Sequence, residues 1–413
     1  MQNDITILRE LSRRYAEIAA LPVQNEKRKL WADHFSLRPT RVPVLLRFGM
    51  HNVWCREVFC DANMKCGDPF YRSYERELRL RMFHYETGDD QIQEPWLVVG
   101  VPHKEGQWNN LWGMDESLLR LNGAKDGNAG CYNPPLKSWD DIGKLRAMRH
   151  VLDEEAGARN HDKLASAVGD ILEIDVQRPP VYNGFTADIS TSIAKLRGLE
   201  QLMVDMYESP DELHKLLAFM RDGILANNRA AEDAGHYTLT LGANQQLAYA
   251  NELETPRANA GPRKRKDIWG FFAAQEYALV SPEFHDEFLF QYQLPIMEHY
   301  GLTHYGCCED LGEKMAMLRG LKNLRSIAVA PRADVRRCAE QIGGDYVMSW
   351  RPNPADMVCC GYDEARIEKI VRKAMDDSEG CFIHINLKDV ETLEGDNTRM
   401  RRWVKKVREI VER

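Results

Sequence analysis

Residues 301–350 carry the sequence GLTHYGCCEDLGEKMAMLRGLKNLRSIAVAPRADVRRCAEQIGGDYVMSW, which decides the fold class. Short apolar runs in this stretch predict strands, and the runs between them have helical spacing. The predicted strands are residues 301–306, 325–330 and 345–350, and the predicted helices are residues 311–321 and 334–342. Strands that alternate with helices at this spacing imply parallel pairing. The stretch therefore predicts an α/β fold.

The same alternation extends to both sides of this stretch. Further strands are expected at residues 42–48, 93–101, 180–185, 237–241 and 381–387, with helices at 363–375 and 397–412. The chain has no Gly-x-Gly-x-x-Gly fingerprint and no P-loop, so successive βα units favour a (β/α)8 TIM-type barrel over a dinucleotide-binding sheet. We expect this barrel at residues 41–413, with an N-terminal helical extension at residues 1–40.

Composition limits the classes of partner. The chain has 413 residues and a formal net charge of -8, which argues against nucleic acid or an anionic membrane as the main partner. No apolar run approaches the roughly 20 residues that a membrane span requires. The ten cysteines, together with an N-terminus that lacks the pattern of a signal peptide, predict a reducing, cytoplasmic setting.

In a barrel, chemistry lies where strands end and βα loops begin. That rule selects the segment after residues 301–306, where an imidazole, two thiols and a carboxylate are close in sequence: His304, Cys307, Cys308 and Glu309. Polar residues at other expected strand ends are candidates for substrate binding: Arg47, Asn183, Gln245 and Arg351. A second doublet, Cys359-Cys360, lies beyond its strand and is the weaker candidate.

Three interpretations of the His304 and Cys307-Cys308 group remain open. Imidazole and thiolate ligands suit zinc, and three protein ligands leave a fourth position for substrate. A second interpretation is a metal-free thiol nucleophile, with Cys308 activated by His304. In the third, both cysteines are small buried apolar side chains.

Three segments resemble a known family. They are residues 180–186 (PVYNGFT) with 206–211 (MYESPD), residues 281–288 (SPEFHDEF), and His304 with Cys307 or Cys308. Together they resemble the uroporphyrinogen decarboxylase-like superfamily. This superfamily includes the decarboxylase and the zinc-dependent methyltransferases that exchange methyl groups with corrinoid proteins. The likeness extends from about residue 179 to the C-terminus.

The resemblance implies a TIM-type barrel and a zinc-assisted methyltransferase that works with a separate corrinoid protein and a small-molecule methyl donor or acceptor. Its implied Zn2+ ligands are His304, Cys307, Cys308 and His384, and its implied catalytic residues are His304, Cys308 and Glu309. Zinc would lower the pKa of a bound thiol, or act as a Lewis acid on a substrate oxygen.

The chain departs from both branches of this superfamily. The decarboxylases carry an arginine-rich run near the N-terminus, whereas here that region has the single Arg47. The methyltransferases place a cysteine after the last strand, whereas here residues 381–387 lead into Lys388-Asp389. A third ligand would then come from His384, Glu309, Asp389 or Cys360.

Two other functions therefore stay open. One is a metal-independent decarboxylase or lyase, with Arg47 and Arg351 holding a small acidic substrate. The other is a barrel that binds a ligand without chemistry, for which Cys307 and Cys308 would be buried in apolar surroundings.

Overall fold

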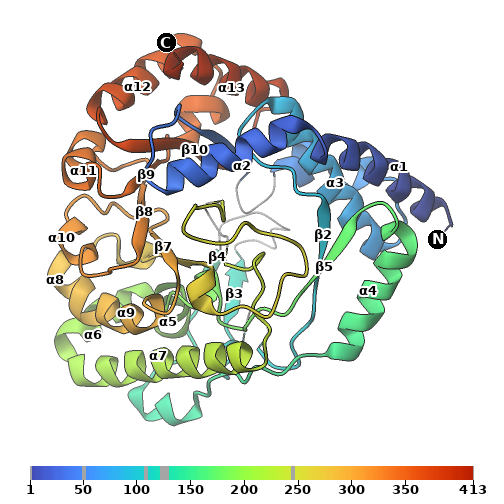
Figure 1. The fold of residues 1–413 in the computed structure, drawn as a ribbon. Helices are drawn as coiled ribbons and strands as arrows, with labels where there is room; N and C mark the ends of the chain where they lie inside the picture. Colours follow the sequence, from blue (N-terminus) through green and yellow to red (C-terminus); the bar gives the residue numbers. More distant parts are fainter. Residues whose placement is uncertain (1, 49–52, 107–109, 121–129, 243–246, 413) are drawn as a thin grey trace.

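The computed structural model describes residues 2–48, 53–106, 110–120, 130–242 and 247–412. Its main sheet has six parallel strands in the order β1-β10-β9-β8-β7-β6. Their bounds are β1 (Val44–Phe48), β6 (Trp269–Phe272), β7 (Leu302–Tyr305), β8 (Leu324–Val329), β9 (Val347–Trp350) and β10 (Phe382–Val390). The sheet curls around the centre of the molecule (Figure 1). The α/β class and its parallel pairing are thus confirmed.

A second parallel sheet consists of β2 (Trp96–Gly100) and β5 (Glu173–Gln177). In Figure 1 it stands on the opposite side of the central space from β7 and β8. Among the described residues, no ladder joins β1 to β2 or β5 to β6, so the hydrogen-bonded sheet is an open half-barrel. A short antiparallel pair, β3 (Ser117–Arg120) and β4 (Gly130–Asn133), lies apart from both sheets.

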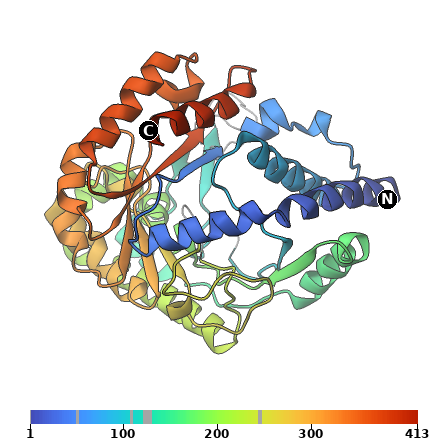
Figure 2. The same ribbon diagram turned by 45° about the horizontal axis from the view of Figure 1, so that its top comes forward.

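Helices cover the outside of the sheets (Figures 1 and 2). In chain order they are α1 (Gln2–Ala19), α2 (Pro22–Phe35), α3 (Pro69–Thr87), α4 (Glu154–Val168), α5 (Ser190–Arg197), α6 (Leu199–Glu208), α7 (Pro210–Asp233), α8 (Pro282–His285), α9 (Gln291–Met297), α10 (Met315–Leu318), α11 (Val335–Ile342), α12 (Glu364–Asp377) and α13 (Thr398–Val411). Within the described residues, no helix is both long and apolar enough to cross a membrane.

Helix α2 covers the amino-terminal ends of the strands. The Phe35 ring lies 5.1 Å from the ring of Trp269 at the start of β6, and the Phe35 carbonyl accepts a hydrogen bond from Arg325 in β8. Helix α1 packs instead against α3 and α4 in a separate apolar cluster that includes Leu8, Leu11 and Leu78. The division of the chain at residue 40 stays a prediction.

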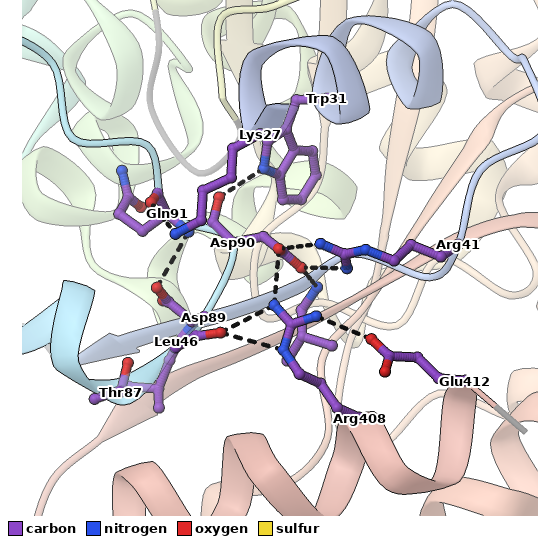
Figure 3. Close-up of polar contacts among 12 residues, drawn as sticks. Lys27, Trp31, Arg41, Leu46, Thr87, Asp89, Asp90, Gln91, Arg408 and Glu412 are labelled. Carbon is purple, nitrogen blue, oxygen red and sulfur yellow. Dashed lines mark hydrogen bonds and ion pairs between the residues drawn. The ribbon is translucent and has the colours of Figure 1, made fainter. Parts of the chain in front are cut away.

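Two side-chain carboxylates seal the gap between β1 and β2 (Figure 3). The backbone N–H of Val44 donates to Asp90 Oδ2 at 2.8 Å, and that of Leu46 donates to Asp89 Oδ2 at 3.2 Å. The Asp90 N–H donates in turn to the Val44 carbonyl at 2.8 Å. Buried backbone groups require hydrogen-bond partners. These two carboxylates accept the hydrogen bonds that a neighbouring strand would otherwise accept from the edge of β1.

Asp90 is fully buried, and its carboxylate forms ion pairs with arginines from distant parts of the chain. Arg41 binds its carboxylate in bidentate fashion at 2.6 and 2.9 Å, and Arg408 of α13 donates to it at 2.8 Å. Trp31 of α2 donates to the Asp90 carbonyl at 2.8 Å. One residue therefore ties α2, β1 and α13 together (Figure 3).

At the other gap, Asn259 contacts the edge of β5 much as a strand would. Its side chain accepts from the Val176 N–H at 3.0 Å and donates to the Ile174 carbonyl at 2.9 Å. Its own N–H donates to Asp175 Oδ1 at 2.7 Å. Asn259 adopts a φ of 52°, in the left-handed region that asparagine tolerates better than most residues.

Two predicted strands are wrong. Residues 180–185 form a loop that enters a 3-10 turn, and residues 237–241 retain only an isolated bridge between Tyr237 and Arg263. In the first case, the Thr186 hydroxyl accepts from the Asn183 N–H and donates to the Val181 carbonyl, each at 2.8 Å. Such side-chain hydrogen bonds compete with a strand ladder.

Replacing Asp90 by Asn should lower the free energy of unfolding by about 3 kcal/mol, because Arg41 and Arg408 would keep their charge without a buried counter-charge. Urea denaturation measures this change. The matched control is Asp170→Asn, since the Asp170 partner of Arg9 is largely exposed, and an exposed pair contributes about 1 kcal/mol or less. Equal losses in the two variants would show that Asp90 does not hold the gap.

Candidate functional site

A thiol pair lies at the carboxyl end of β7. Gly306 follows the strand with a φ of 105°, and a Cβ there would come within 2.7 Å of Leu311 and 2.9 Å of Ala328, so glycine is required for this turn. The turn places Cys307 and Cys308 with their sulfur atoms 3.4 Å apart. Cys307 is buried and Cys308 is exposed, so the pair lies at the boundary between core and solvent.

Lys388 lies beside both sulfurs. Its Nζ is 3.6 Å from Cys307 Sγ and 3.7 Å from Cys308 Sγ. It also forms an ion pair with Asp389 at 2.5 Å. Lys388 comes from β10, three strands away from β7 in the sheet order, and the curl of the sheet brings them together. The sequence places Lys388 directly after the last predicted strand, where site residues are expected, but no role was predicted for it.

The contacts of the two thiols shift their pKa values in opposite directions. The hydrogen bond from Cys308, reinforced by Lys388 and Arg351, lowers the pKa of Cys307 to about 6 against the opposing effect of burial. The same hydrogen bond raises the pKa of the Cys308 thiol. Because thiolates are the reactive form of cysteine, this arrangement presents a Cys307 thiolate supported by a Cys308 thiol at neutral pH.

Glu309 is fully buried and holds the thiol segment against the end of β6. Its Oε1 accepts from the Ala274 N–H at 2.8 Å, and its Oε2 accepts from the Cys307 N–H at 2.9 Å. Both carboxylate oxygens are thus used by backbone donors. In this geometry Glu309 positions Cys307, and the catalytic role predicted for it stays a prediction.

His304 is buried, and both of its ring nitrogens face protein groups. Arg351 Nη2 lies 3.0 Å from His304 Nε2, and Ser326 Oγ lies 2.9 Å from His304 Nδ1. The same Nε2 also lies 3.2 Å from the Gly306 carbonyl, so this nitrogen contacts one group that donates and one that accepts. Burial, followed by the charge of Arg351, holds the pKa of His304 well below its usual range, so the ring is neutral.

His384 contacts helix α2 through one ring nitrogen, and its Nε2 is buried without a hydrogen-bond partner among the described residues. Its Nδ1 lies 2.9 Å from Nε2 of His34 in α2, and both rings are buried. Among the described residues, no group of three His, Cys, Asp or Glu side chains is arranged to hold a metal ion. The structure therefore brings Cys307 and Cys308 together, but it does not bring His304 and His384 to the same point. Zinc binding stays a prediction.

Two arginines come close to each other next to this site. Arg351 is fully buried and donates to the Cys307 carbonyl and to His304. Burial, followed by the nearby charge of Arg351, lowers the pKa of Arg47 to about 10. The Nε atoms of both arginines are buried without a hydrogen-bond partner among the described residues. Two cations with unused donors are suited to an anionic group.

A cavity of about 550 Å³ opens beside Arg47 at the gap between β1 and β2. Its polar lining includes Arg81, His84 and Gln93, and its apolar lining includes Trp96. Gln93 Nε2 is buried without a partner among the described residues. The cavity thus offers polar donors and apolar walls to a small molecule.

Two predicted substrate contacts remain. Asn183 lies in the loop that follows β5, and Phe185 of the same loop packs against Phe271 and Cys307, so the predicted role of Asn183 in substrate binding stays a prediction. Gln245 lies outside the described residues.

No known protein family matches the chain by sequence, and neither does any curated protein. Among solved structures, the chain is similar to a methyltransferase from Methanosarcina mazei, with a TM-score of 0.54 and 12% sequence identity. The match covers 92% of this chain and 97% of the methyltransferase. At this identity the likeness shows a shared fold along nearly the whole of both chains.

Removing the Cys308 thiol should raise the pKa of Cys307, because the hydrogen bond that favours the thiolate would be lost. In the wild type, alkylation of Cys307 by iodoacetamide should reach its maximal rate near pH 7. In Cys308→Ala the rate should still rise between pH 7 and 9. Peptide-resolved mass spectrometry measures both profiles. Cys360→Ala, which removes an exposed thiol of the other doublet, should keep the wild-type profile, and identical profiles in all three proteins would contradict the coupling.

Proposed function

We propose that this protein is a methyltransferase in which Cys307 is the nucleophile, and that its two parallel sheets belong to a (β/α)8 barrel of the uroporphyrinogen decarboxylase-like type. The observation that carries the proposal is the Cys307-Cys308 pair beside Lys388, at the carboxyl end of β7. The fold shared with a methyltransferase supports it. The eight parallel strands, six in one sheet and two in the other, agree with the strand number of such a barrel.

The chemistry follows from the state of the thiols. A methyl group moves to a strong nucleophile, and the Cys307 thiolate is the strongest that the described site offers. Its sulfur attacks the methyl carbon, the bond from that carbon to the donor atom breaks, and the electron pair stays on the donor. Cys308 keeps its proton on the hydrogen bond to Cys307, and Lys388 neutralises the charge of the pair until the new bond forms.

The residues present do not fit a zinc ion in the arrangement described. Among the described residues, Cys307 and Cys308 are adjacent, Lys388 lies against both, and Nε2 of His304 contacts Arg351 and the Gly306 carbonyl. We therefore derive no step through a metal. A separate corrinoid protein remains the proposed source of the methyl group.

A second candidate, a metal-independent lyase or decarboxylase, is favoured by one observation. Arg47 lines a cavity and feels the charge of the buried Arg351, and each arginine has an Nε without a hydrogen-bond partner among the described residues. These arginines would hold the carboxylate of an acidic substrate. In the methyltransferase proposal the same pair would bind an acidic methyl donor or acceptor.

Methylcobalamin is the probe for the methyltransferase proposal. Incubated in the dark with the protein, it should lose its methyl–cobalt absorption while the peptide that contains Cys307 gains the mass of one CH2 unit. Cys307→Ser should lower the rate by roughly 10²-fold or more, as expected for removal of a nucleophile. Cys360→Ser is the matched control and should react at the wild-type rate.

A different set of results would favour the lyase or decarboxylase. If neither methylcobalamin nor a methylated small acid transfers a methyl group to the protein, while an acidic substrate loses carbon dioxide in a reaction that requires Arg47 and Arg351, the second candidate replaces the first.

A further inference from the structure

We propose that Lys388 and Arg351 permanently take the place of a metal ion at the thiol pair, so that this centre is built to work with internal cations. What this means for methyl transfer rests on the proposed function. The prediction that the site binds no metal does not depend on it.

The position of Lys388 is the first ground for this proposal. Its ammonium is almost equidistant from the two sulfurs, at 3.6 and 3.7 Å. The residue is only 7% exposed, and a buried charge is costly unless it is paired. Asp389 and the sulfur pair are its partners, so the site is organised around a positive charge that the chain itself supplies.

A metal bound to both sulfurs would compete with this ammonium. Zinc lies about 2.3 Å from each thiolate ligand, and therefore lies in the plane equidistant from the two sulfurs. Lys388 Nζ lies close to that same plane. Metal binding from the side of the lysine would require its displacement, and binding from the other side would place two cations on the same sulfur pair.

The second reason for the proposal lies in the contacts that the ring nitrogens of His304 and His384 make. His304 Nε2 lies 3.0 Å from Arg351 Nη2 and 3.2 Å from the Gly306 carbonyl. The same arginine donates to the Cys307 carbonyl, which fixes the guanidinium between His304 and the thiol segment. His384 is paired with His34 through Nδ1, and its Nε2 is buried without a hydrogen-bond partner among the described residues. The contacts of His304 therefore leave its Nε2 engaged by protein groups rather than by a metal.

Chemically, an ammonium differs from a metal at a thiolate. It neutralises negative charge and donates weak hydrogen bonds to the sulfurs, but it forms no coordinate bond. A coordinated thiolate shares one of its lone pairs with the metal. Lys388 is therefore a positioning residue of the thiol pair, and Arg351 positions the backbone of Cys307.

Metal binding tests this proposal directly. Wild-type protein purified without chelator should contain zinc well below one ion per chain, and added Co2+ should give no thiolate-to-metal charge-transfer absorption. Lys388→Met should bind Co2+ at least roughly 10-fold more tightly, with that absorption present, because the competing charge is gone. Lys388→Arg retains a cation and should resemble the wild type.

Lys314→Met is the matched control. Lys314 is also a buried lysine, but its Nζ donates to the Tyr277 carbonyl at 2.7 Å, so its loss should leave Co2+ binding unchanged. Circular dichroism and thermal melting check the fold of every variant. If Lys388→Met does not fold, the metal content of the wild type still decides.

About one tightly bound zinc per wild-type chain, lost in Cys307→Ala or Cys308→Ala, would overturn the proposal. No gain of Co2+ binding in a folded Lys388→Met protein would overturn it too. Failure of methyl transfer in a metal-free wild type would count against the proposed function alone, because the metal content is measured independently of turnover.

Discussion

The buried carboxylate of Asp90 is the interaction on which the arrangement of the sheet depends. It accepts from the Val44 N–H at the edge of β1 and is held by Arg41 and Arg408. Strand β1 pairs in parallel with β10, with Val44 opposite Ile385, and β10 carries Lys388. The contacts of Asp90 with the edge of β1 therefore also stabilise the position of β10, the strand that carries Lys388. A gap in the ladder is tolerated because side chains satisfy the backbone groups that the missing pairing leaves free.

The distribution of charge around the thiols differs from that of the whole chain. The protein carries a net charge of -8, yet Arg47, Arg351 and Lys388 lie at the ends of β1, β9 and β10 near Cys307. The carboxylate that contacts the Cys307 backbone in the described part of the chain, that of Glu309, accepts from two N–H groups. Converging cations in a largely buried region favour anions and developing negative charge, which agrees with a thiolate and with an acidic substrate beside it.

The strands that build this site were predictable because short runs rich in apolar residues alternate with helix-like runs. The predicted runs 301–306, 325–330, 345–350 and 381–387 all overlap observed strands. Strand β5, with the sequence EIDVQ, was missed because it is followed by Pro179 and Pro180, which drew the prediction to the next apolar run. The strand-end rule located Cys307 and Arg351, but no sequence spacing shows that β10 curls back to β7, or that Arg351 contacts His304. Those contacts depend on tertiary geometry.

The resemblance to zinc-dependent methyltransferases implies a set of metal ligands that this thiol pair does not have. The resemblance implies a cysteine after the last predicted strand, and this chain has Lys388 at that point. A site with one thiolate ligand fewer has a much lower metal affinity, and a thiolate at the boundary of the core then needs another source of positive charge. In the proposed centre, Lys388 supplies that charge from β10, and Arg351 contacts His304 Nε2 and the Cys307 carbonyl. The two cations act together, because one lies at the sulfurs and the other at the histidine that the resemblance implies as a ligand.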